Sequence, residues 1–330
     1  MKKILAFRTD RLGDFIITKQ SLNLFLKNKN EYEIDMVVSP QNYEYIKHFK
    51  SINKKYIFEG SYIRFFFKNF NILKKNYDYL ILYDGKKRSH IISFFIRGKK
   101  ISLSKSKNLF KIANFFKYIS IFNSDYTVQL ENFNFINLIL EKKNSKTNDF
   151  YFDYEFKKLD FELPLSKNKN FIFHLDEKWF KEFYYNDFDH CEWDNNFFYK
   201  LIKNIFNKYR LPIIITTGPY KIPFLENIKK DFIEIKKNVF LHNNYKKNLI
   251  IVDNLSFREL ETLIKNYAIK LLCCEGGVSH VSHNLDIETI ALFQDGREYF
   301  YKHWTGHMKN LKLIKRGGQE HILNIFGNLD

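Results

Sequence analysis

Residues 3–16 read Lys-Ile-Leu-Ala-Phe-Arg-Thr-Asp-Arg-Leu-Gly-Asp-Phe-Ile, and this stretch decides the fold class. The apolar run at residues 3–8 predicts a buried strand, and the apolar spacing over residues 15–26 predicts a helix soon after it. Gly13 permits a tight turn between the two. A strand that passes through a tight turn into a helix begins a βαβ unit, so the sequence predicts a parallel sheet from its start.

The same alternation continues through the first half of the chain. Further strands are predicted at residues 34–38, 56–58, 78–83 and 100–103. Ser39-Pro40 is a typical helix start, because proline is tolerated at the first helical position. Each predicted strand is separated from the next by a plausible helix, which favours a parallel sheet over a meander.

A polar region around residues 141–148 and again at 163–170 predicts the domain junction, with domains at 1–160 and 168–330. The alternation then resumes. Strands are predicted at residues 171–175, 212–217, 249–252, 269–274 and 288–293. Helices are predicted at residues 196–208, after Pro219, at 256–265 with Ser256 and Glu259 as a capping box, and from about Gly277. The predicted fold is α/β, with two Rossmann-like doubly wound domains.

The charge is unevenly distributed along the chain, whose formal net charge is +17. Residues 1–150 hold 28 Lys+Arg against 13 Asp+Glu, whereas residues 151–330 hold 26 against 24. The abundant residue types have AT-rich codons, and such a bias would add basic residues evenly. The asymmetry instead favours an anionic partner for the first half, such as a phospholipid surface, a phosphorylated glycan or nucleic acid.

Cysteine usage and hydropathy give expectations about the compartment. Cys191, Cys273 and Cys274 suggest neither a disulfide framework nor a zinc site. The apolar run at residues 4–7 is too short for a signal sequence, and the longest apolar stretches are far below the roughly 20 residues of a membrane span. We therefore expect a cytoplasmic protein.

Two strand–turn–helix segments carry candidate chemistry. Asp14 follows the first strand, where open α/β sheets bind ligands, and it is either a functional carboxylate or a helix cap. Residues 272–280 form a second such turn, with Glu275-Gly276-Gly277 before a predicted helix. Bare glycines and a helix N-terminus favour a phosphate, although an ordinary βα turn explains the pattern too.

Several other site types receive little support. His280 and His283 share a helix face, but no third metal ligand can be placed. Asp187-Phe188-Asp189 has the Asp-x-Asp form of a metal site, in an irregular stretch where such a pattern arises by chance. The Gly-x-Gly-x-x-Gly fingerprint and the Walker loop are absent, which argues against NAD and against a P-loop nucleotide site. No nucleic-acid-binding motif is visible.

Together, the two turns resemble a known family. A strand–Asp-Arg-Leu-Gly-Asp–helix start at residues 10–14, a strand–acidic-x-Gly-x-Ser-His–helix segment at residues 275–280, and a strand at residues 289–293 are similar to bacterial heptosyltransferases, glycosyltransferase family 9. The resemblance is strongest at residues 3–26 and 253–294. It implies a GT-B fold, in which two Rossmann-like domains face each other across a cleft.

The resemblance also implies roles for individual residues. Asp14 would be the catalytic base, with Arg11 and Gly13 on the acceptor side, and Lys178, within residues 174–179, would meet the donor phosphates. The other implied donor-binding residues are Gly218, Glu275, Gly276, Gly277, Val278, Ser279 and His280. The reaction would be an inverting, metal-independent transfer without a cofactor. The donor would be a nucleotide-sugar such as an ADP-linked heptose.

The implied acceptor is an anionic glycan or glycolipid, such as the lipopolysaccharide core, reached by peripheral contact with the inner membrane face. Residues 64–70 and 94–100 mix aromatic and cationic side chains and are the candidate membrane contacts, unless they form a buried helix face with solvated lysines. Nucleic acid is not expected as a partner.

The chain departs from the family pattern at three places. Glu275-Gly276-Gly277 stands where the family has Asp-Thr-Gly or Asp-Gly-Pro, residues 281–284 replace a run of small residues, and Gln20 replaces a proline. A heptose donor is therefore not assumed. The alternatives are a non-catalytic protein that binds a sugar nucleotide or glycan, a basic nucleic-acid-binding protein, and another sugar-nucleotide enzyme such as an epimerase.

Overall fold

The structure is a computed structural model that describes residues 1–26, 30–103, 116–119, 127–129, 132, 136–137, 155–181 and 191–327. The chain divides into two compact units, Met1–Glu155 and Phe156–Asp330. This division falls a few residues before the end of the predicted first domain, 1–160. The polar segment at 141–148, on which that prediction partly rested, lies outside the described residues.

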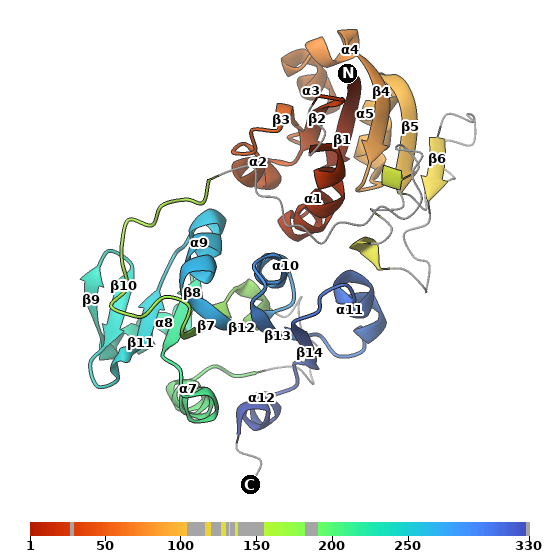
Figure 1. Cartoon of the computed structure of the whole chain (residues 1–330). Helices are drawn as coiled ribbons and strands as arrows, with labels where there is room; N and C mark the ends of the chain where they lie inside the picture. Colours follow the sequence, from red (N-terminus) through yellow and green to blue (C-terminus); the bar gives the residue numbers. More distant parts are fainter. Residues whose placement is uncertain are drawn as a thin grey trace. The chain divides into compact units, whose positions relative to one another are not determined.

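The first unit is built on a six-stranded sheet with the order β3-β2-β1-β4-β5-β6 (Figure 1). Its strands are β1 (Lys2–Arg8), β2 (Tyr32–Val38), β3 (Ile52–Ile57), β4 (Asn76–Leu82), β5 (Arg97–Leu103) and β6 (Phe116–Ile119). Every neighbouring pair is parallel. The strand order reverses between β1 and β4. From β1 the chain continues to β2 on one side of the sheet, whereas from β4 it continues to β5 on the other side.

Helices connect these strands as the predicted alternation requires. They are α1 (Leu12–Leu26), α2 (Pro40–Ile46), α3 (Tyr62–Lys68), α4 (Asn71–Lys74) and α5 (Lys87–Phe94). The helix start predicted at Ser39-Pro40 is confirmed, and Ser39 caps α2, since its hydroxyl accepts from the Asn42 amide at 3.2 Å. Phe65 of α3, Ile72 of α4 and Ile92 of α5 share one buried cluster with strand side chains, so these three helices cover the same face of the sheet.

The second unit has an eight-stranded sheet with the order β14-β13-β12-β7-β8-β11-β10-β9. Its strands are β7 (Asn170–Leu175), β8 (Ile213–Thr217), β9 (Phe232–Lys236), β10 (Val239–His242), β11 (Lys246–Val252), β12 (Ala268–Cys274), β13 (Glu288–Phe293) and β14 (Leu311–Lys315). The six parallel strands, taken in chain order, repeat the order of the first unit. The reversal here falls between β7 and β12.

The edge of this sheet departs from the prediction. β9 and β10 form an antiparallel hairpin that extends the sheet beyond β11, and the sequence-based account contained no such hairpin. Its two-residue turn contains Asn238 in the left-handed region, with φ 62°. Most β9 side chains are exposed, so the strand lacks the apolar run on which the prediction relied.

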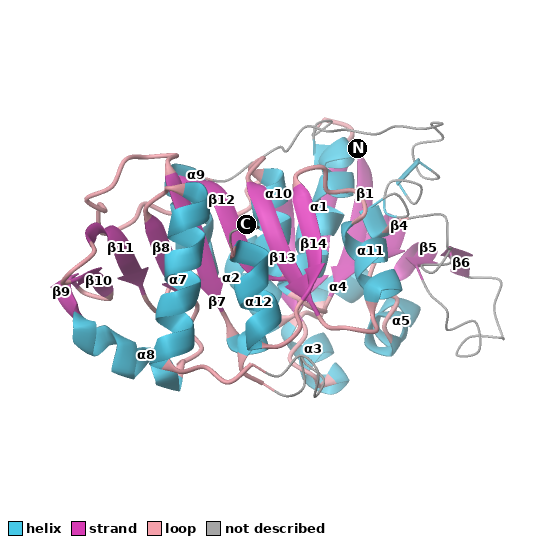
Figure 2. Ribbon diagram, turned by 90° about the horizontal axis from the view of Figure 1, so that it is seen from below, coloured by secondary structure: helices cyan, strands magenta, loops and turns pink. Residues whose placement is uncertain are grey.

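Helices cover both faces of the second sheet. They are α7 (Asn195–Tyr209), α8 (Pro223–Ile228), α9 (Phe257–Tyr267), α10 (Gly277–Asn284), α11 (Glu298–Thr305) and α12 (Gln319–Phe326), with short 3₁₀ segments η2 (Glu177–Trp179) and η5 (Lys229–Asp231). Figure 2 shows α7 and α12 in front of the strands, and both contribute to the same buried cluster. The predicted capping box of Ser256 and Glu259 is confirmed. Within the described residues, no helix has the length and apolar character to span a membrane.

Candidate active site

The first group of functional side chains lies where β1 and β4 end, at the reversal of strand order. Arg8 is the last residue of β1 and is buried. Its guanidinium donates to the Tyr83 carbonyl and to the Asp14 carbonyl, each at 2.9 Å. Arg8 therefore ties the end of β4 to the first turn of α1, and it fixes the backbone that carries Asp14.

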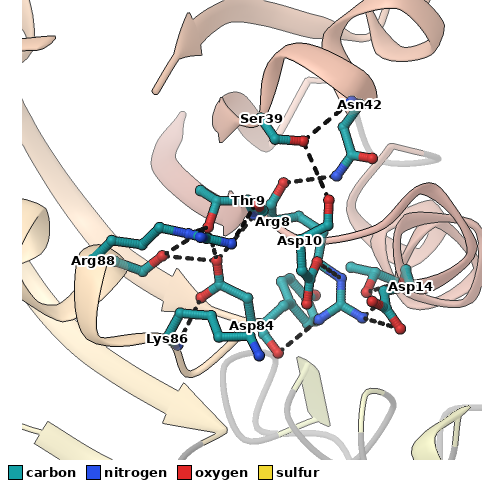
Figure 3. A network of polar contacts seen from close by, with 12 residues as sticks. Arg8, Thr9, Asp10, Asp14, Ser39, Asn42, Asp84, Lys86 and Arg88 are labelled. Carbon is teal, nitrogen blue, oxygen red and sulfur yellow. Dashed lines mark hydrogen bonds and ion pairs between the residues drawn. The ribbon is translucent and has the colours of Figure 1, made fainter. Parts of the chain in front are cut away.

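Two carboxylates lie beside the Arg8 guanidinium (Figure 3). The Asp10 carboxylate is 3.3 Å from Arg8 Nε, and the Asp14 carboxylate is 3.8 Å from Arg8 Nη2. Asp14 is the third residue of α1, so it does not cap the helix, which was the structural alternative for this residue. A neighbouring guanidinium balances the charge of a carboxylate and restricts its orientation, as a positioned base requires.

Asp10 is a weaker acid than an ordinary aspartate. Burial raises the pKa of Asp10 to about 7; the Arg8 guanidinium opposes this shift, while the negative charges of Asp14 and Asp84 add to it. Near neutral pH, Asp10 therefore carries a proton for much of the time. The carboxyl group beside Arg8 Nε is therefore a carboxylic acid for much of the time.

A second layer of contacts holds the turn between β1 and α1. The buried Asp84 carboxylate accepts from the Thr9 amide at 3.0 Å and from the Ser89 hydroxyl at 2.7 Å. Arg88 donates to the Thr9 hydroxyl and to the Thr9 carbonyl, each at 2.6 Å. Arg8, Asp84 and Arg88 had no predicted role. Asp84 carried a signal of its own, because it is a polar residue directly after the strand predicted at residues 78–83.

The predicted acceptor residues lie in the same turn. Arg11 is exposed immediately before α1, and Gly13 is half-buried in its first turn. The structure therefore places Arg11, Gly13 and Asp14 together at the carboxyl edge of the first sheet. Below, this group together with Arg8, Asp10 and Asp84 is called the Asp14 site.

The second group lies where β7 and β12 end, at the reversal of the second sheet. Lys178, in η2 after β7, donates its ammonium to the Glu275 carbonyl after β12. A Cβ built on Gly276 would overlap the Lys178 ammonium, so a glycine is needed there for this approach. Burial lowers the pKa of Lys178, but Asp176 and Glu275 outweigh it, so the pKa lies above its usual range and the cation persists.

The turn leads directly into α10. The Ser279 hydroxyl donates to the Gly276 carbonyl at 2.7 Å and accepts from the Gly276 amide at 3.2 Å, which locks the first turn. The first amides of a helix lack acceptors within the helix and lie at the positive end of its dipole. Gly277 and Val278 are the first residues of α10. The ammonium and the helix N-terminus together can bind an anion such as a diphosphate. Residues 275–280 with Lys178 are called the Gly276 turn below.

Arg316 supports the Gly276 turn from behind, and the sequence analysis did not identify it. Its buried guanidinium donates to the carbonyls of Lys178 and Trp179 and lies 5.5 Å from the centre of the Trp179 ring. The Trp179 indole in turn donates to the His174 carbonyl at 3.0 Å. Arg316 follows β14 and precedes Gly317, but no strand was predicted at residues 311–315, so nothing in the sequence analysis marked Arg316 as a strand-end residue. It positions the backbone of Lys178.

Histidines surround the start of α10. His280 Nε2 is 3.5 Å from the Glu275 carboxylate, and the His280 ring is parallel to that of His307, with centroids 6.1 Å apart. Burial lowers the pKa of His283 to about 4, and the neighbouring His280 adds to the shift. Within the part of the chain that is described, no group of three His, Cys, Asp or Glu residues is arranged to hold a metal ion. Asp187 and Asp189 lie outside the described residues.

Two further sets of predicted residues have simple positions. Gly218 directly follows β8, the neighbour of β7, so it lies one strand away from the Gly276 turn at the same sheet edge. No described atom beyond its neighbours is within 4 Å of a Cβ built on Gly218. Cys191, Cys273 and Cys274 are buried free thiols.

Comparisons with known proteins identify the fold. No protein-family profile and no curated protein matches the sequence. A glycosyltransferase of family 9 from Veillonella parvula matches with a TM-score of 0.68 at 13% identity, over 95% of this chain and 87% of that chain. The Escherichia coli heptosyltransferase WaaC, solved with ADP-2-deoxy-2-fluoro heptose, matches with a TM-score of 0.64 at 14% identity, over 94% and 92%.

A third match is the Escherichia coli ADP-heptose lipopolysaccharide heptosyltransferase II, with a TM-score of 0.64 at 12% identity, over 98% of this chain and 95% of that chain. These matches extend over both units. The chain has the GT-B fold, which confirms the fold class of two Rossmann-like domains. At identities this low, the likeness concerns the fold alone.

Proposed function

We propose that the chain is a glycosyltransferase that moves a sugar from a nucleotide-sugar to a hydroxyl of an anionic bacterial glycan. The contact of the Lys178 ammonium with the Glu275 carbonyl, directly beside Gly276, carries this proposal. This contact brings together two residues that are 97 positions apart in the sequence, and it places a positive charge where an anion can bind. The contact lies at the point where the strand order of the sheet reverses, and open α/β sheets bind ligands at such points. A nucleoside diphosphate is the anion that such a site suits in a GT-B fold.

The donor half would stabilise the departing diphosphate. As the bond between the anomeric carbon and the phosphate oxygen breaks, the diphosphate leaves with the bonding electrons and gains negative charge. The Lys178 ammonium and the first amides of α10 would offset that charge without a metal ion. Arg316, by holding the backbone of Lys178, would keep the ammonium in place through the reaction.

The acceptor half would supply the base. The Asp14 carboxylate would take the proton of the acceptor hydroxyl. At the same time the hydroxyl oxygen would attack the anomeric carbon from the face opposite the diphosphate, so the configuration at that carbon inverts. Arg8 positions this carboxylate through two contacts. Arg11 and Gly13, in the same turn, would contact the acceptor. Binding of the donor and the acceptor in a defined orientation would supply much of the remaining rate enhancement.

The structurally similar proteins and the distribution of charge along the chain support a more specific proposal for the two substrates. WaaC has been solved with ADP and with an ADP-heptose analogue, which supports an ADP-linked heptose or a related sugar as donor. The basic first half supports an anionic glycan or glycolipid acceptor, such as a lipopolysaccharide core, at the cytoplasmic face of the inner membrane. Gly218, Val278 and His280 would complete the donor site around the nucleotide-sugar.

A nucleotide panel tests the donor half first. Purified protein is titrated with ADP, UDP, GDP, CDP and CMP, in EDTA and in Mg²⁺, and its thermal midpoint is measured beside a generic DNA duplex. We expect one nucleoside diphosphate to raise the midpoint equally with and without Mg²⁺. A response to DNA alone, weakened by salt, would instead identify a nucleic-acid-binding protein and overturn the proposal.

An epimerase is the second candidate function. A UDP-N-acetylglucosamine 2-epimerase from Listeria monocytogenes matches with a TM-score of 0.53 at 12% identity, over 98% of this chain and 86% of that chain. The fold therefore does not separate the two reactions. Incubation with the stabilising nucleotide's sugar conjugate does: an epimer formed without any acceptor favours the epimerase, whereas nucleoside diphosphate released only with acceptor favours the transferase.

A further inference from the structure

The outer surface of α3, α4 and α5 exposes a cluster of large apolar side chains. The exposed fractions are 83% for Phe67, 72% for Ile63, 58% for Phe94, 57% for Phe95 and 56% for Phe70. These five residues are called the phenylalanine face below. Single exposed apolar residues are ordinary on a protein surface, but a contiguous group of this size marks an interaction site.

The five side chains belong to one surface. The helices that carry them pack against the same face of the first sheet through one buried cluster. Phe66 of α3 contacts Phe95, directly after α5, with ring centroids 5.4 Å apart, and Phe95 contacts Phe94 at 5.4 Å. These ring contacts join α3 to the end of α5. The sequence-based alternative of a buried helix face holds for Phe65 and is wrong for Phe67 and Phe94.

The charges around this face are mainly positive, although Lys68 ion-pairs with Glu59 at 2.8 Å. Residues 60–76 and 85–103, which contain the whole face, hold ten Lys and Arg residues and no Asp or Glu. Arg64, Lys68, Lys74, Arg97 and Lys99 are exposed. Lys74 lies over the Phe70 ring at 5.1 Å, so cation and aromatic ring are interleaved. Aromatic side chains among an excess of cations are the composition of a surface that enters an anionic lipid interface.

The phenylalanine face is separate from the Asp14 site. α5 begins at Lys87, near the edge of the sheet that carries Asp84, and ends at Phe94, toward the opposite edge where β5 starts at Arg97. Phe70 likewise precedes α4 and the start of β4. Substitutions on this face can therefore be made without touching the residues assigned to chemistry.

We propose that the phenylalanine face docks on an anionic lipid bilayer, with the phenylalanine rings entering the interface and the surrounding cations contacting lipid phosphates. Lys86 and Lys87 continue the basic surface from this face along α5 to the edge of the sheet that carries the Asp14 site. The inference concerns a surface that the transfer chemistry does not use, so it stands or falls independently of the proposed function.

Vesicle flotation of the full chain tests the docking. Vesicles of phosphatidylcholine alone are compared with vesicles that also contain about 30 mol% phosphatidylglycerol, an anionic lipid. We expect the protein to float with the anionic vesicles and to remain behind with the neutral ones. Phe67→Ser/Phe94→Ser should reduce the bound fraction by at least about tenfold, because two of the inserted aromatic rings are removed.

Matched controls distinguish docking through the phenylalanine face from non-specific hydrophobic binding. Ile233→Ser/Ile235→Ser removes two exposed apolar side chains from β9 in the second unit, where the exposed fractions are 61% and 46%, and should leave flotation unchanged. Arg97→Gln/Lys99→Gln should lower binding to anionic vesicles and make it less sensitive to salt. Asp14→Asn should float as the unaltered protein does, whatever its transfer activity.

Three outcomes would overturn the inference. One is the absence of binding to anionic vesicles, and another is equal binding by the Phe67→Ser/Phe94→Ser variant and the unaltered chain. The third is a dimer in sedimentation velocity that this double variant abolishes while vesicle binding persists, because the face would then join two copies of the chain. Circular dichroism of each variant checks that it is folded.

Discussion

The Asp14 site and the Gly276 turn occupy the same topological position in two sheets whose parallel strands have the same order. They differ in whether side chains or backbone atoms form most of the site. Each lies where the first and fourth parallel strands of its unit end side by side. The Asp14 site consists mainly of charged side chains, with Asp10 and Asp14 beside the buried Arg8 guanidinium. The Gly276 turn consists mainly of backbone, with one ammonium placed over a glycine.

The difference shows how one fold position is adapted to two tasks. A base must be a defined side chain held by other side chains, and such a network needs a guanidinium with several donors. A phosphate site needs backbone amides and free space, which a glycine turn before a helix supplies. A shared topology thus offers an edge for ligands, and local residue choice decides whether that edge holds a proton acceptor or an anion.

Replacement of the base should have the largest effect on this comparison. Asp14→Asn keeps the side-chain shape but removes the proton acceptor, so transfer should fall by about 10²–10⁴-fold while nucleotide affinity stays the same. Initial rates with the identified donor and acceptor, together with calorimetric titration of the nucleotide, measure the two quantities. Asp10→Asn is the matched control, since Asp10 already carries a proton for much of the time near neutral pH. Equal losses in both variants would assign the chemistry to the pair rather than to Asp14.

The protonation of Asp10 should appear as a pH dependence of stability. The folded chain holds the Asp10 proton up to a pKa of about 7, whereas an unfolded Asp releases it near 3.8. Between these values the folded state binds more protons, so this contribution to stability is full in acid and is lost as the pH rises to about 7. The difference in unfolding free energy between the unaltered chain and Asp10→Asn should therefore fall by up to about 4 kcal/mol across that window.

The two units can be followed separately in that experiment. All three tryptophans, Trp179, Trp193 and Trp304, lie in the second unit, so fluorescence reports its unfolding. Circular dichroism reports both units, and the pH-dependent difference should appear in the transition that fluorescence does not follow. Parallel pH profiles for the two proteins would show that Asp10 is an ordinary ionised carboxylate.

Loss of the donor-side cation should be the next largest effect. Lys178→Met removes a charge-assisted hydrogen-bond donor, a change of about 1.5–3 kcal/mol, so nucleoside diphosphate affinity should weaken by about 10–100-fold. Lys181→Met is the control, because Lys181 lies three residues further on and ion-pairs with Glu177 at 3.8 Å. Calorimetric titration gives both dissociation constants. Equal nucleotide affinities of the two variants would show that Lys178 has only a structural role.

A methyl group on the glycine turn should have the smallest effect. Gly276→Ala places a Cβ where the Lys178 ammonium lies, and the flexible lysine can move away from it. The variant also gives an L residue a φ of 159°, so part of its cost should appear as lower stability rather than weaker nucleotide binding. Nucleotide affinity should weaken by less than about tenfold, less than in Lys178→Met. In the control Gly327→Ala, the new Cβ would be 3.4 Å from the nearest atom, the Leu323 carbonyl oxygen, which is ordinary contact. The double variant Gly276→Ala/Lys178→Met should bind as weakly as Lys178→Met alone, if the glycine acts only through the lysine.

The elements that the sequence predicted well are those with strong local signals. β1 and β12 contain the apolar runs 4–7 and 271–274, and α9 has a complete capping box, so their positions follow from residues close together in the chain. The β9–β10 hairpin was missed because its side chains are mostly exposed and its turn is marked by Asn238 alone. For residues 64–70 and 94–100 the sequence left both an exposed and a buried face open, since an amphipathic pattern does not tell which apolar residues a neighbouring helix will cover.

The sequence by itself determined the βαβ alternation, the two strand–turn–helix segments and the candidates Asp14 and Gly276, because apolar periodicity and glycine conformation are local properties. Only the tertiary structure decided which residues join them. Arg8 reaches Asp14 because β1 runs into α1, whereas Asp84 and Lys178 reach their partners because strands far apart in sequence are neighbours at the reversals of strand order. Strand adjacency is set by how helices and sheets bury their apolar faces over the whole domain, and no short stretch of sequence contains that information.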